Sequence, residues 1–442
     1  MKHPPPHARF SWPGAVRALV IGSGLSAVAL LSGCEAEPAC RECNVILISL
    51  DTLRADRLGA YGYPRETSPQ IDAFASESAV FLNTLAQHAN TPASHQSLFT
   101  GLYVSEEDEA PRITELLGAR GYRTAAFTGG GLLHRRFGFA RGFDVYHDSV
   151  QRTGLAQVTP LAINWLRKNR EHPFFLLLHT YDIHCPYTPP APFLEMFTEH
   201  YRPGLRHLLG CRREASGREL SPESVELISA AYDGGVRWTD TLLGRFFDEI
   251  ERLELDRKTI VVLVSDHGES LGEEGFFGHG WFKEETHKVP LIIHVPGSDP
   301  RITNEPAQLV DVLPTTLRLL GIEPPTGLDG VDLGPILRGE FSFEGHRPRL
   351  GLNPLGEVMF RVDDDFVLID RLFSDDLLYD LNSEWRDVAS EHPERVESLL
   401  AQLAEFRRTR PAGSRLTPDK PPDLDEVPAE LREQLRALGY VD

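Results

Sequence analysis

One stretch of the chain, Thr91-Pro-Ala-Ser-His-Gln-Ser-Leu-Phe-Thr-Gly101, places a hydroxyl, a histidine and a helix start close together. Thr91 before Pro92 is typical of a helix N-cap followed by the first helical residue, and Gly101 suits the end of the helix. The unpaired amides of a helix start favour negative charge, so a hydroxyl there lies where an oxyanion is stabilised. We predict that Thr91 is a nucleophile; the alternative is that it only caps the helix.

Acidic residues and histidines follow three apolar runs. Asp51 ends the first run, Asp182 and His184 follow the second, and Asp266 with His267 follows the third. Functional residues of parallel sheets collect at the carboxyl ends of strands. Two carboxylates and one imidazole from these ends suit a divalent cation, which would lower the pKa of a nearby hydroxyl and neutralise a bound anion.

Apolar strands and helices must position these groups. The expected strands are residues 44–51, 123–128, 173–179, 258–266 and 289–295, and the expected helices are residues 112–121, 155–168 and 224–253. This alternation predicts an α/β fold with a mostly parallel sheet sandwiched by helices. His179 ends one of these runs and is assigned no function, because it fits equally well as a core residue of the strand.

The pattern changes after about residue 340. Short strands are expected at 349–352, 358–362, 366–370 and 377–381, followed by an amphipathic helix at 394–407. We therefore predict a catalytic domain at 44–340 and, at 341–442, a small C-terminal α+β subdomain with an antiparallel sheet and a tail.

The first 33 residues differ from the rest, with three basic residues, no acid and an apolar run at 18–31. This segment fits a secretory signal, and Leu31-Ser-Gly-Cys34 resembles the lipidation box of bacterial lipoproteins. We predict export to the periplasm or cell surface and membrane contact through a lipidated Cys34, after which 34–43 is a tether. A plain signal peptide and an uncleaved anchor are the alternatives.

Charge limits the class of partner. The formal net charge of −20 argues against nucleic acid or anionic lipid as a general partner. An anionic substrate would therefore need a metal ion or a few placed basic residues. Of the remaining cysteines, Cys40 and Cys43 fit a disulfide, a metal half-site or a redox pair, with a structural role favoured, and Cys185 is able to pair with Cys211 in an oxidising compartment.

The chain resembles the sulfatase family of the alkaline phosphatase superfamily. The matching stretches, in order, are 44–63, 91–103, 121–144, 179–190, 265–296 and 309–339, with Leu378-Tyr-Asp-Leu381 and 433–440 near the end. The resemblance covers nearly all of the chain after the signal. It implies an alkaline phosphatase-like α/β core, a small C-terminal subdomain, one divalent metal and a nucleophile at the helix start.

Carried over by position, the resemblance assigns roles to seven residues. Asp51, Asp266 and His267 would be metal ligands, with Thr91 completing the shell as nucleophile. His95 would replace the family's arginine beside the nucleophile, His279 a lysine that contacts the anionic oxygens, and His184 would match the histidine near the leaving oxygen. Ser94, the rival hydroxyl, ranks second because the family places the nucleophile three residues earlier.

Departures from the family pattern bear on the substrate. Members that cleave sulfate esters use a cysteine or serine converted to formylglycine, and Thr91 cannot become that aldehyde. Thr52 stands where many have a further aspartate, and His267 where many have asparagine. These changes resemble the branches that use an unmodified threonine on phosphorus, so an anionic phospho(di)ester of a small molecule, glycan or lipid is favoured.

Three points stay open. A sulfatase acting without formylglycine and a non-catalytic protein that binds glycans or lipids are the alternative functions. Zinc or manganese is favoured by the histidine ligand, although calcium and magnesium also accept the carboxylates. The oligomeric state is not predicted.

Overall fold

Strand β1 (Asn44–Leu50) lies at the centre of an eight-stranded sheet with the order β11-β2-β10-β7-β1-β6-β4-β5. The computed structural model describes residues 40–103, 110–148, 153–198, 220–280, 282–340, 347–353, 357–363, 365–371, 374–382 and 386–409. The other strands of this sheet are β2 (Ala79–Phe81), β4 (Arg123–Phe127), β5 (Val145–His147), β6 (Phe174–Thr180), β7 (Thr259–Val264), β10 (Leu291–His294) and β11 (Arg301–Thr303).

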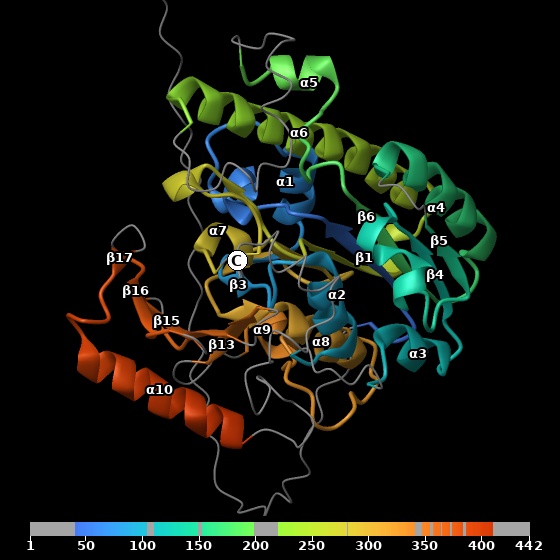
Figure 1. Ribbon diagram of the computed structural model, residues 1–442. Coiled ribbons are helices and arrows are strands. Elements are labelled where there is room, and N and C mark those ends of the chain that lie inside the picture. Colours follow the sequence, from blue (N-terminus) through green and yellow to red (C-terminus); the bar gives the residue numbers. More distant parts are fainter. Residues whose placement is uncertain are drawn as a thin grey trace, which may run out of the picture. The chain divides into compact units, whose positions relative to one another are not determined.

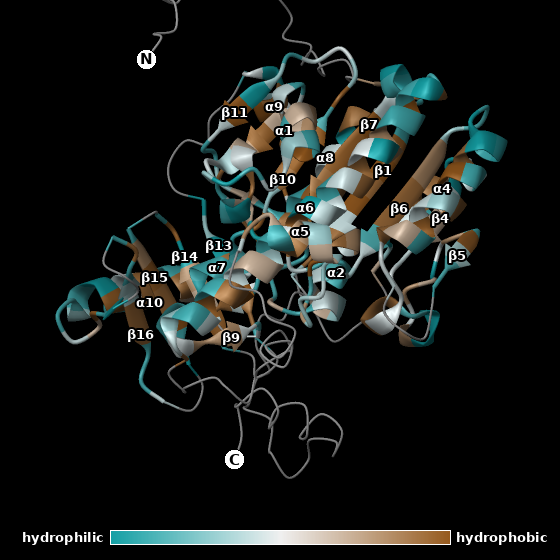
Figure 2. Ribbon diagram, turned by 90° about the horizontal axis from the view of Figure 1, so that it is seen from above, coloured by the Kyte–Doolittle hydropathy of each residue, from teal (hydrophilic) through white to brown (hydrophobic). Residues whose placement is uncertain are grey.

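Every residue of β1 is buried because helices cover both faces of the sheet. Ile46 and Ile48 belong to one core cluster, whereas Val45 and Leu47 belong to a second cluster on the opposite face. The first face packs against α1 (Pro69–Ser76), α4 (Leu155–Asn169), α5 (Ala191–Glu195) and α6 (Pro222–Arg252); the second against α2 (Thr91–Thr100), α3 (Ile113–Gly118), α8 (Val312–Leu319) and α9 (Gly334–Arg338). Figure 1 shows α6 and α2 on opposite sides of the sheet, and Figure 2 shows the apolar strands between the helix layers.

The predicted fold class is confirmed, with one strand in an unexpected direction. β1 runs parallel to β6 and β7, and β4 runs parallel to β5 and β6. Strand β10 is antiparallel to both of its neighbours, β7 and β2. The apolar character of residues 289–295 predicted correctly that this strand is buried. It carried no information about the direction of the strand, which depends on the connection that precedes it.

The C-terminal residues form the predicted antiparallel sheet. Its order is β13-β14-β15-β16-β17, and helix α10 (Pro393–Arg408) packs on it. The strands are β13 (Arg349–Leu352), β14 (Val358–Arg361), β15 (Phe366–Asp370), β16 (Leu377–Asp380) and β17 (Arg386–Asp387). Tyr103 and Val310 share its core cluster, and Arg349 donates to the Asn83 side chain. Contacts therefore join the two sheets, and the described residues belong to one compact unit.

Short elements complete the loops at the carboxyl edge of the main sheet. They are β3 (Thr84–Leu85), which pairs with β12 (Ala307–Gln308), β8 (Ser270–Leu271), which pairs with β9 (Phe277–Gly278), and helix α7 (Glu284–His287). Within the described ranges, no helix combines the length and the apolar character needed to cross a bilayer.

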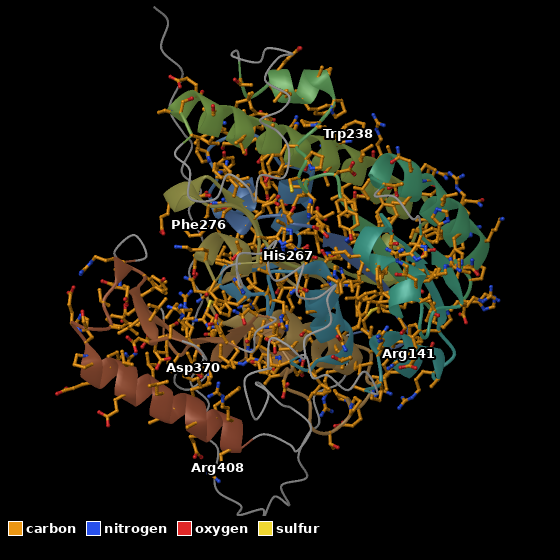
Figure 3. All side chains as sticks on the ribbon, in the orientation of Figure 1. Arg141, Trp238, His267, Phe276, Asp370 and Arg408 are labelled. Atoms are coloured by element: carbon orange, nitrogen blue, oxygen red, sulfur yellow. A yellow bond between two sulfur atoms is a disulfide. The ribbon has the colours of Figure 1, made fainter. Side chains whose placement is uncertain are left out.

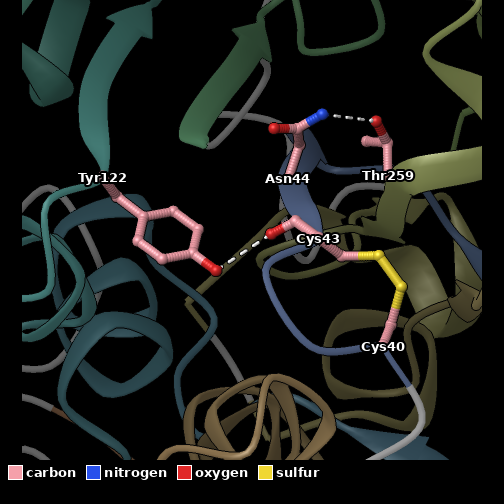
Figure 4. The surroundings of a disulfide bond; sticks show 5 residues. All are labelled: Cys40, Cys43, Asn44, Tyr122 and Thr259. Atoms are coloured by element: carbon pink, nitrogen blue, oxygen red, sulfur yellow. Dashed lines mark hydrogen bonds between the residues drawn. A yellow bond between two sulfur atoms is a disulfide. The ribbon is translucent and has the colours of Figure 1, made fainter. Parts of the chain in front are cut away.

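A disulfide between Cys40 and Cys43 precedes β1 (Figure 4). The Tyr122 hydroxyl donates to the Cys43 carbonyl at 3.0 Å, which ties this turn to the sheet. Of the alternatives for Cys40 and Cys43, the structure shows the disulfide. Cys185 is also a disulfide cysteine, whereas its predicted partner Cys211 lies outside the described residues, as do the signal segment, Cys34 and the tail.

Candidate active site

The start of α2 positions the Thr91 hydroxyl. Asn90, and not Thr91, is the N-cap: its side chain accepts a hydrogen bond from the Ala93 amide at 3.0 Å. The prediction that Thr91 caps the helix was therefore wrong, because a better capping residue immediately precedes it. Thr91 is instead the first helical residue, and its hydroxyl donates to Asp51 Oδ2 at 3.0 Å. Gly101 ends the helix in the left-handed conformation, with φ of 69°, as predicted.

The turn after β1 brings Asp51 beside the end of β7. Thr52 has φ of 59°, a conformation that a β-branched residue rarely adopts. Its amide donates to Asp266 Oδ1 at 3.3 Å, and its carbonyl accepts from the Tyr232 hydroxyl of α6 at 2.6 Å. These contacts fix the turn and hold Asp51 and Asp266 at one edge of the sheet.

Asp51, Asp266 and His267 form a group suited to a cation. One donor atom from each lies within 4.8 Å of the other two, and all three side chains are fully buried. Asp51 Oδ1, Asp266 Oδ2 and His267 Nε2 have no hydrogen-bond partner among the described residues. Buried polar atoms normally have a hydrogen-bond partner. Three buried atoms that have none and lie close together are therefore suited to bind a divalent ion as its ligands. His267 lies among the packed interior side chains (Figure 3).

The electrostatics of Asp51, Asp266 and His267 also favour a bound cation. Burial, and then the neighbouring Asp51 charge, raise the pKa of Asp266 above its ordinary value. Burial alone would lower the pKa of His267, but the Asp266 and Asp51 carboxylates outweigh it and raise that pKa. Two buried carboxylates with little compensating charge make the group a strong attractor of cations.

The tautomer of His267 is set by its backbone. Its Nδ1–H donates to the Gly268 carbonyl at 2.9 Å, which leaves the lone pair on Nε2, 3.5 Å from Asp266 Oδ2. A histidine held in this way presents a neutral nitrogen to a metal.

His95 lies next to Thr91 and Asp266. Its Nδ1–H donates to the Thr91 carbonyl at 2.8 Å, and its Nε2 accepts from the Ser49 hydroxyl at 2.9 Å. It is fully buried, and burial lowers its pKa to about 4 despite Asp266 Oδ2 at 3.5 Å. This geometry makes His95 a positioning residue for Thr91 and Asp266.

His184 and His279, the other two predicted imidazoles, adjoin the cation group. His184 Nε2 lies 4.0 Å from Asp51 Oδ1 and 3.2 Å from His279 Nε2. The rings of His279 and His267 have centroids 4.3 Å apart. All seven residues predicted to form the site are thus brought into one buried neighbourhood.

Two neighbouring residues were not predicted from the sequence. His179 lies in β6 with its Nε2 3.5 Å from Asp51 Oδ2, and burial lowers its pKa to about 4. Glu269 follows the Asp-His-Gly sequence, and burial raises its pKa to about 7. The available signal was only the position of His179 at the carboxyl end of an apolar run. Its place opposite Ser49, two residues before Asp51, is set by the register of the folded sheet.

Two other candidates have structural roles. Asp182 Oδ2 accepts from the Leu155 amide at 2.7 Å, where it holds the start of α4. The Ser94 hydroxyl donates to the Asp266 carbonyl at 2.6 Å, so its proton is engaged with the backbone.

Comparisons with known proteins show the family to which the chain belongs. The family described as Sulfatase matches residues 43–322. The ulvan-active sulfatase of Formosa agariphila is 27% identical over 67% of this chain and 65% of its own length. The multifunctional alkaline phosphatase superfamily protein of Trinickia caryophylli is 28% identical over 40% of each chain. The chain thus spans less than two thirds of the length of these curated relatives.

Solved structures share the fold. The phosphonate monoester hydrolase of Agrobacterium radiobacter superposes with a TM-score of 0.69 at 21% identity, covering 83% of this chain and 95% of its own. A structure in complex with D-glucosamine-2-N,6-O-disulfate gives 0.70 at 19%, covering 83% and 97%. Since the family match extends over more than half of the sequence, the chain belongs to the sulfatase family of hydrolases, within the alkaline phosphatase superfamily.

Proposed function

We propose that the chain is a metal-dependent ester hydrolase that attacks its substrate through Thr91, with phosphodiesters and related phosphorus esters favoured. The observation that carries this proposal is the 3.0 Å hydrogen bond from the Thr91 hydroxyl to Asp51. This bond lies beside the three buried atoms of Asp51, Asp266 and His267 that have no hydrogen-bond partner among the described residues. A hydroxyl used only for capping would bond to helix amides, a role that Asn90 already performs.

The residues divide the reaction between them. Thr91 Oγ1 gives its proton to the Asp51 carboxylate and forms a bond to phosphorus. The bond from phosphorus to the leaving oxygen breaks at the same time. His184 or His279 supplies a proton to that oxygen. Water then attacks phosphorus in line and returns a proton to the imidazole, while the bond from phosphorus to Thr91 Oγ1 breaks and that oxygen takes its proton back from the carboxylate. A divalent ion held by Asp51, Asp266 and His267 would lower the pKa of the hydroxyl and neutralise anionic oxygens.

The chemistry of threonine favours phosphorus. Thr91 cannot form the aldehyde by which formylglycine expels sulfate, whereas a phosphothreonine is open to attack by water. The likeness to a phosphonate monoester hydrolase supports this choice, and the ulvan-active sulfatase keeps sulfate esters as the second candidate. Histidine among the ligands favours zinc or manganese, with calcium and magnesium as alternatives.

An ester panel tests the proposal. Purified chain, stripped with a chelator and reloaded with Zn²⁺ or Mn²⁺, is assayed on an aryl phosphodiester, an aryl phosphonate monoester and an aryl sulfate. We expect Thr91→Ala to lose roughly 10³-fold or more in kcat/KM on the preferred ester, Thr91→Ser to keep part of it, and Ser94→Ala to lose far less. Full activity of Thr91→Ala would remove Thr91 from the mechanism, and activity on aryl sulfate alone would favour the sulfatase alternative.

Metal content separates catalysis from mere binding. A non-catalytic binder of glycans or lipids has no need for Asp51, Asp266 and His267 around an ion. Purified protein that contains no metal, takes none up and hydrolyses no ester would support that alternative.

Export with lipid attachment at Cys34 is part of the proposal. It is supported by the basic and apolar residues before Leu31-Ser-Gly-Cys34. Labelling of cells with a fatty acid should mark the wild-type chain and leave Cys34→Ala unmarked; equal labelling of both would argue against this anchor.

A further inference from the structure

We propose that His184, Glu269 and His279 form a second divalent cation site, next to the group of Asp51, Asp266 and His267. One donor atom from each of the three lies within 4.8 Å of the other two, and all three side chains are buried. Two imidazole nitrogens and one carboxylate are the ligands that catalytic zinc sites use with a fourth, open position.

The two imidazoles present lone pairs to one another. His279 Nδ1–H donates to the Ala89 carbonyl at 2.9 Å, and His184 Nδ1–H donates to the Cys185 carbonyl. Each ring in its neutral form therefore carries its lone pair on Nε2, and these two nitrogens lie 3.2 Å apart. Two lone pairs at this distance repel unless a proton or a metal ion lies between them. A cation bound between the two rings would take both lone pairs as ligands.

Glu269 supplies the third ligand and decides between proton and metal. Its side chain is fully buried, and neither carboxylate oxygen has a hydrogen-bond partner among the described residues. The Tyr187 hydroxyl and the Cys185 amide lie beside this carboxylate and lower its pKa in part. A shared imidazole proton leaves this carboxylate unpaired, whereas a divalent ion satisfies all three groups together.

The two groups adjoin at Asp51. His184 Nε2 lies 4.0 Å from Asp51 Oδ1, and the His279 ring lies against the His267 ring. A pair of cations here would neutralise charge on both the attacking and the leaving side of a phosphorus centre. That catalytic role rests on the proposed function. His184 and His279 would then act as ligands instead of proton donors, and the leaving oxygen would be stabilised by the ion and take its proton from water. The number of bound ions does not depend on the reaction.

Metal stoichiometry tests the site. Full-length chain stripped with a chelator is dialysed against Zn²⁺, and bound zinc is measured by elemental analysis. We expect two ions per wild-type chain. Glu269→Gln and His279→Gln should each keep one, while Asp266→Asn should lose the neighbouring one. Glu285→Gln, which changes a glutamate of the same loop region bonded to Ser270, should keep both.

The outcomes are distinct from those that test the reaction. One ion per wild-type chain that depends on Asp266 but not on Glu269 overturns the second site and leaves the proposed function standing. Two ions that both survive Glu269→Gln and His279→Gln also overturn it. Anomalous scattering from wild-type crystals soaked in Zn²⁺ requires no variant to fold: a peak bounded by His184, Glu269 and His279 supports the site, and its absence overturns it.

Discussion

The hydroxyl of Thr91 and the carboxylate of Asp51 meet at 3.0 Å although 40 positions separate them in the sequence. One residue starts a helix and the other follows the central strand. Their contact joins the proposed nucleophile to the proposed cation site, so the charge on Asp51 should control both.

Asp51→Asn tests this connection. The substitution keeps the size of the side chain and one oxygen but removes the charge, so we expect Zn²⁺ affinity to fall at least about tenfold and ester hydrolysis to fall by roughly 10²-fold or more. Equilibrium dialysis and initial rates measure the two effects. Asp182→Asn, at an acid that holds the start of α4, should keep the metal affinity; an equal loss there would mean that Asp51 has no special role.

His179 should support Asp51. Its Nε2 lies 3.5 Å from Asp51 Oδ2, on the side that also receives the Thr91 hydroxyl. Groups that orient a metal ligand typically contribute 10- to 100-fold in affinity, so we expect His179→Ala to weaken Zn²⁺ binding by roughly that factor. His147→Ala, at an exposed histidine of β5, is the control. Unchanged Zn²⁺ affinity in His179→Ala would show that His179 only packs in the core and does not support Asp51.

His95 should act through structure. His95→Ala removes two buried hydrogen bonds, to Thr91 and Ser49, and leaves a void, so we expect a loss of about 2–4 kcal/mol in the free energy of unfolding. Urea unfolding measures it. A variant with native stability, unchanged KM and a much lower kcat would instead place His95 in the chemical step.

Tyr232 should hold the turn that carries Asp51. Tyr232→Phe leaves the Thr52 carbonyl and the Arg54 amide without their partner, which we expect to cost about 1–3 kcal/mol and to weaken Zn²⁺ binding. Tyr61→Phe is a matched control, because its hydroxyl bonds both backbone groups of Leu291. The control should lose stability but keep its metal affinity. Equal metal affinities in the two variants would contradict this role for Tyr232.

Asp240 should make stability depend on pH. Burial raises its pKa to about 7, although the amides of Gln70 and Ile71 lower it in part. Between the unfolded pKa of about 3.9 and 7, the folded chain holds a proton that the unfolded chain has lost, so this carboxyl contributes less to stability as pH rises. The melting temperature of Asp240→Asn relative to wild type should increase from pH 5 to pH 8; a constant difference would show that Asp240 is ionised throughout.

Local sequence was enough to locate most strands and helices of the catalytic part. Apolar runs such as 44–50 must be buried wherever they lie, and the position of Asp51 directly after one of them is a property of the chain itself. Asp51, Asp266 and His267 could therefore be named in advance as candidate ligands, with the family resemblance to support them.

Tertiary structure decided which atoms face one another. The direction of β10, the approach of His179 to Asp51 and the bond from His279 to the Ala89 carbonyl depend on segments remote in sequence. The orientation of a buried side chain is determined by the packing and hydrogen-bonding groups around it, and these come together only when the sheet has formed. For that reason the sequence named candidate ligands, whereas only the folded chain showed two groups of possible metal-binding side chains next to each other.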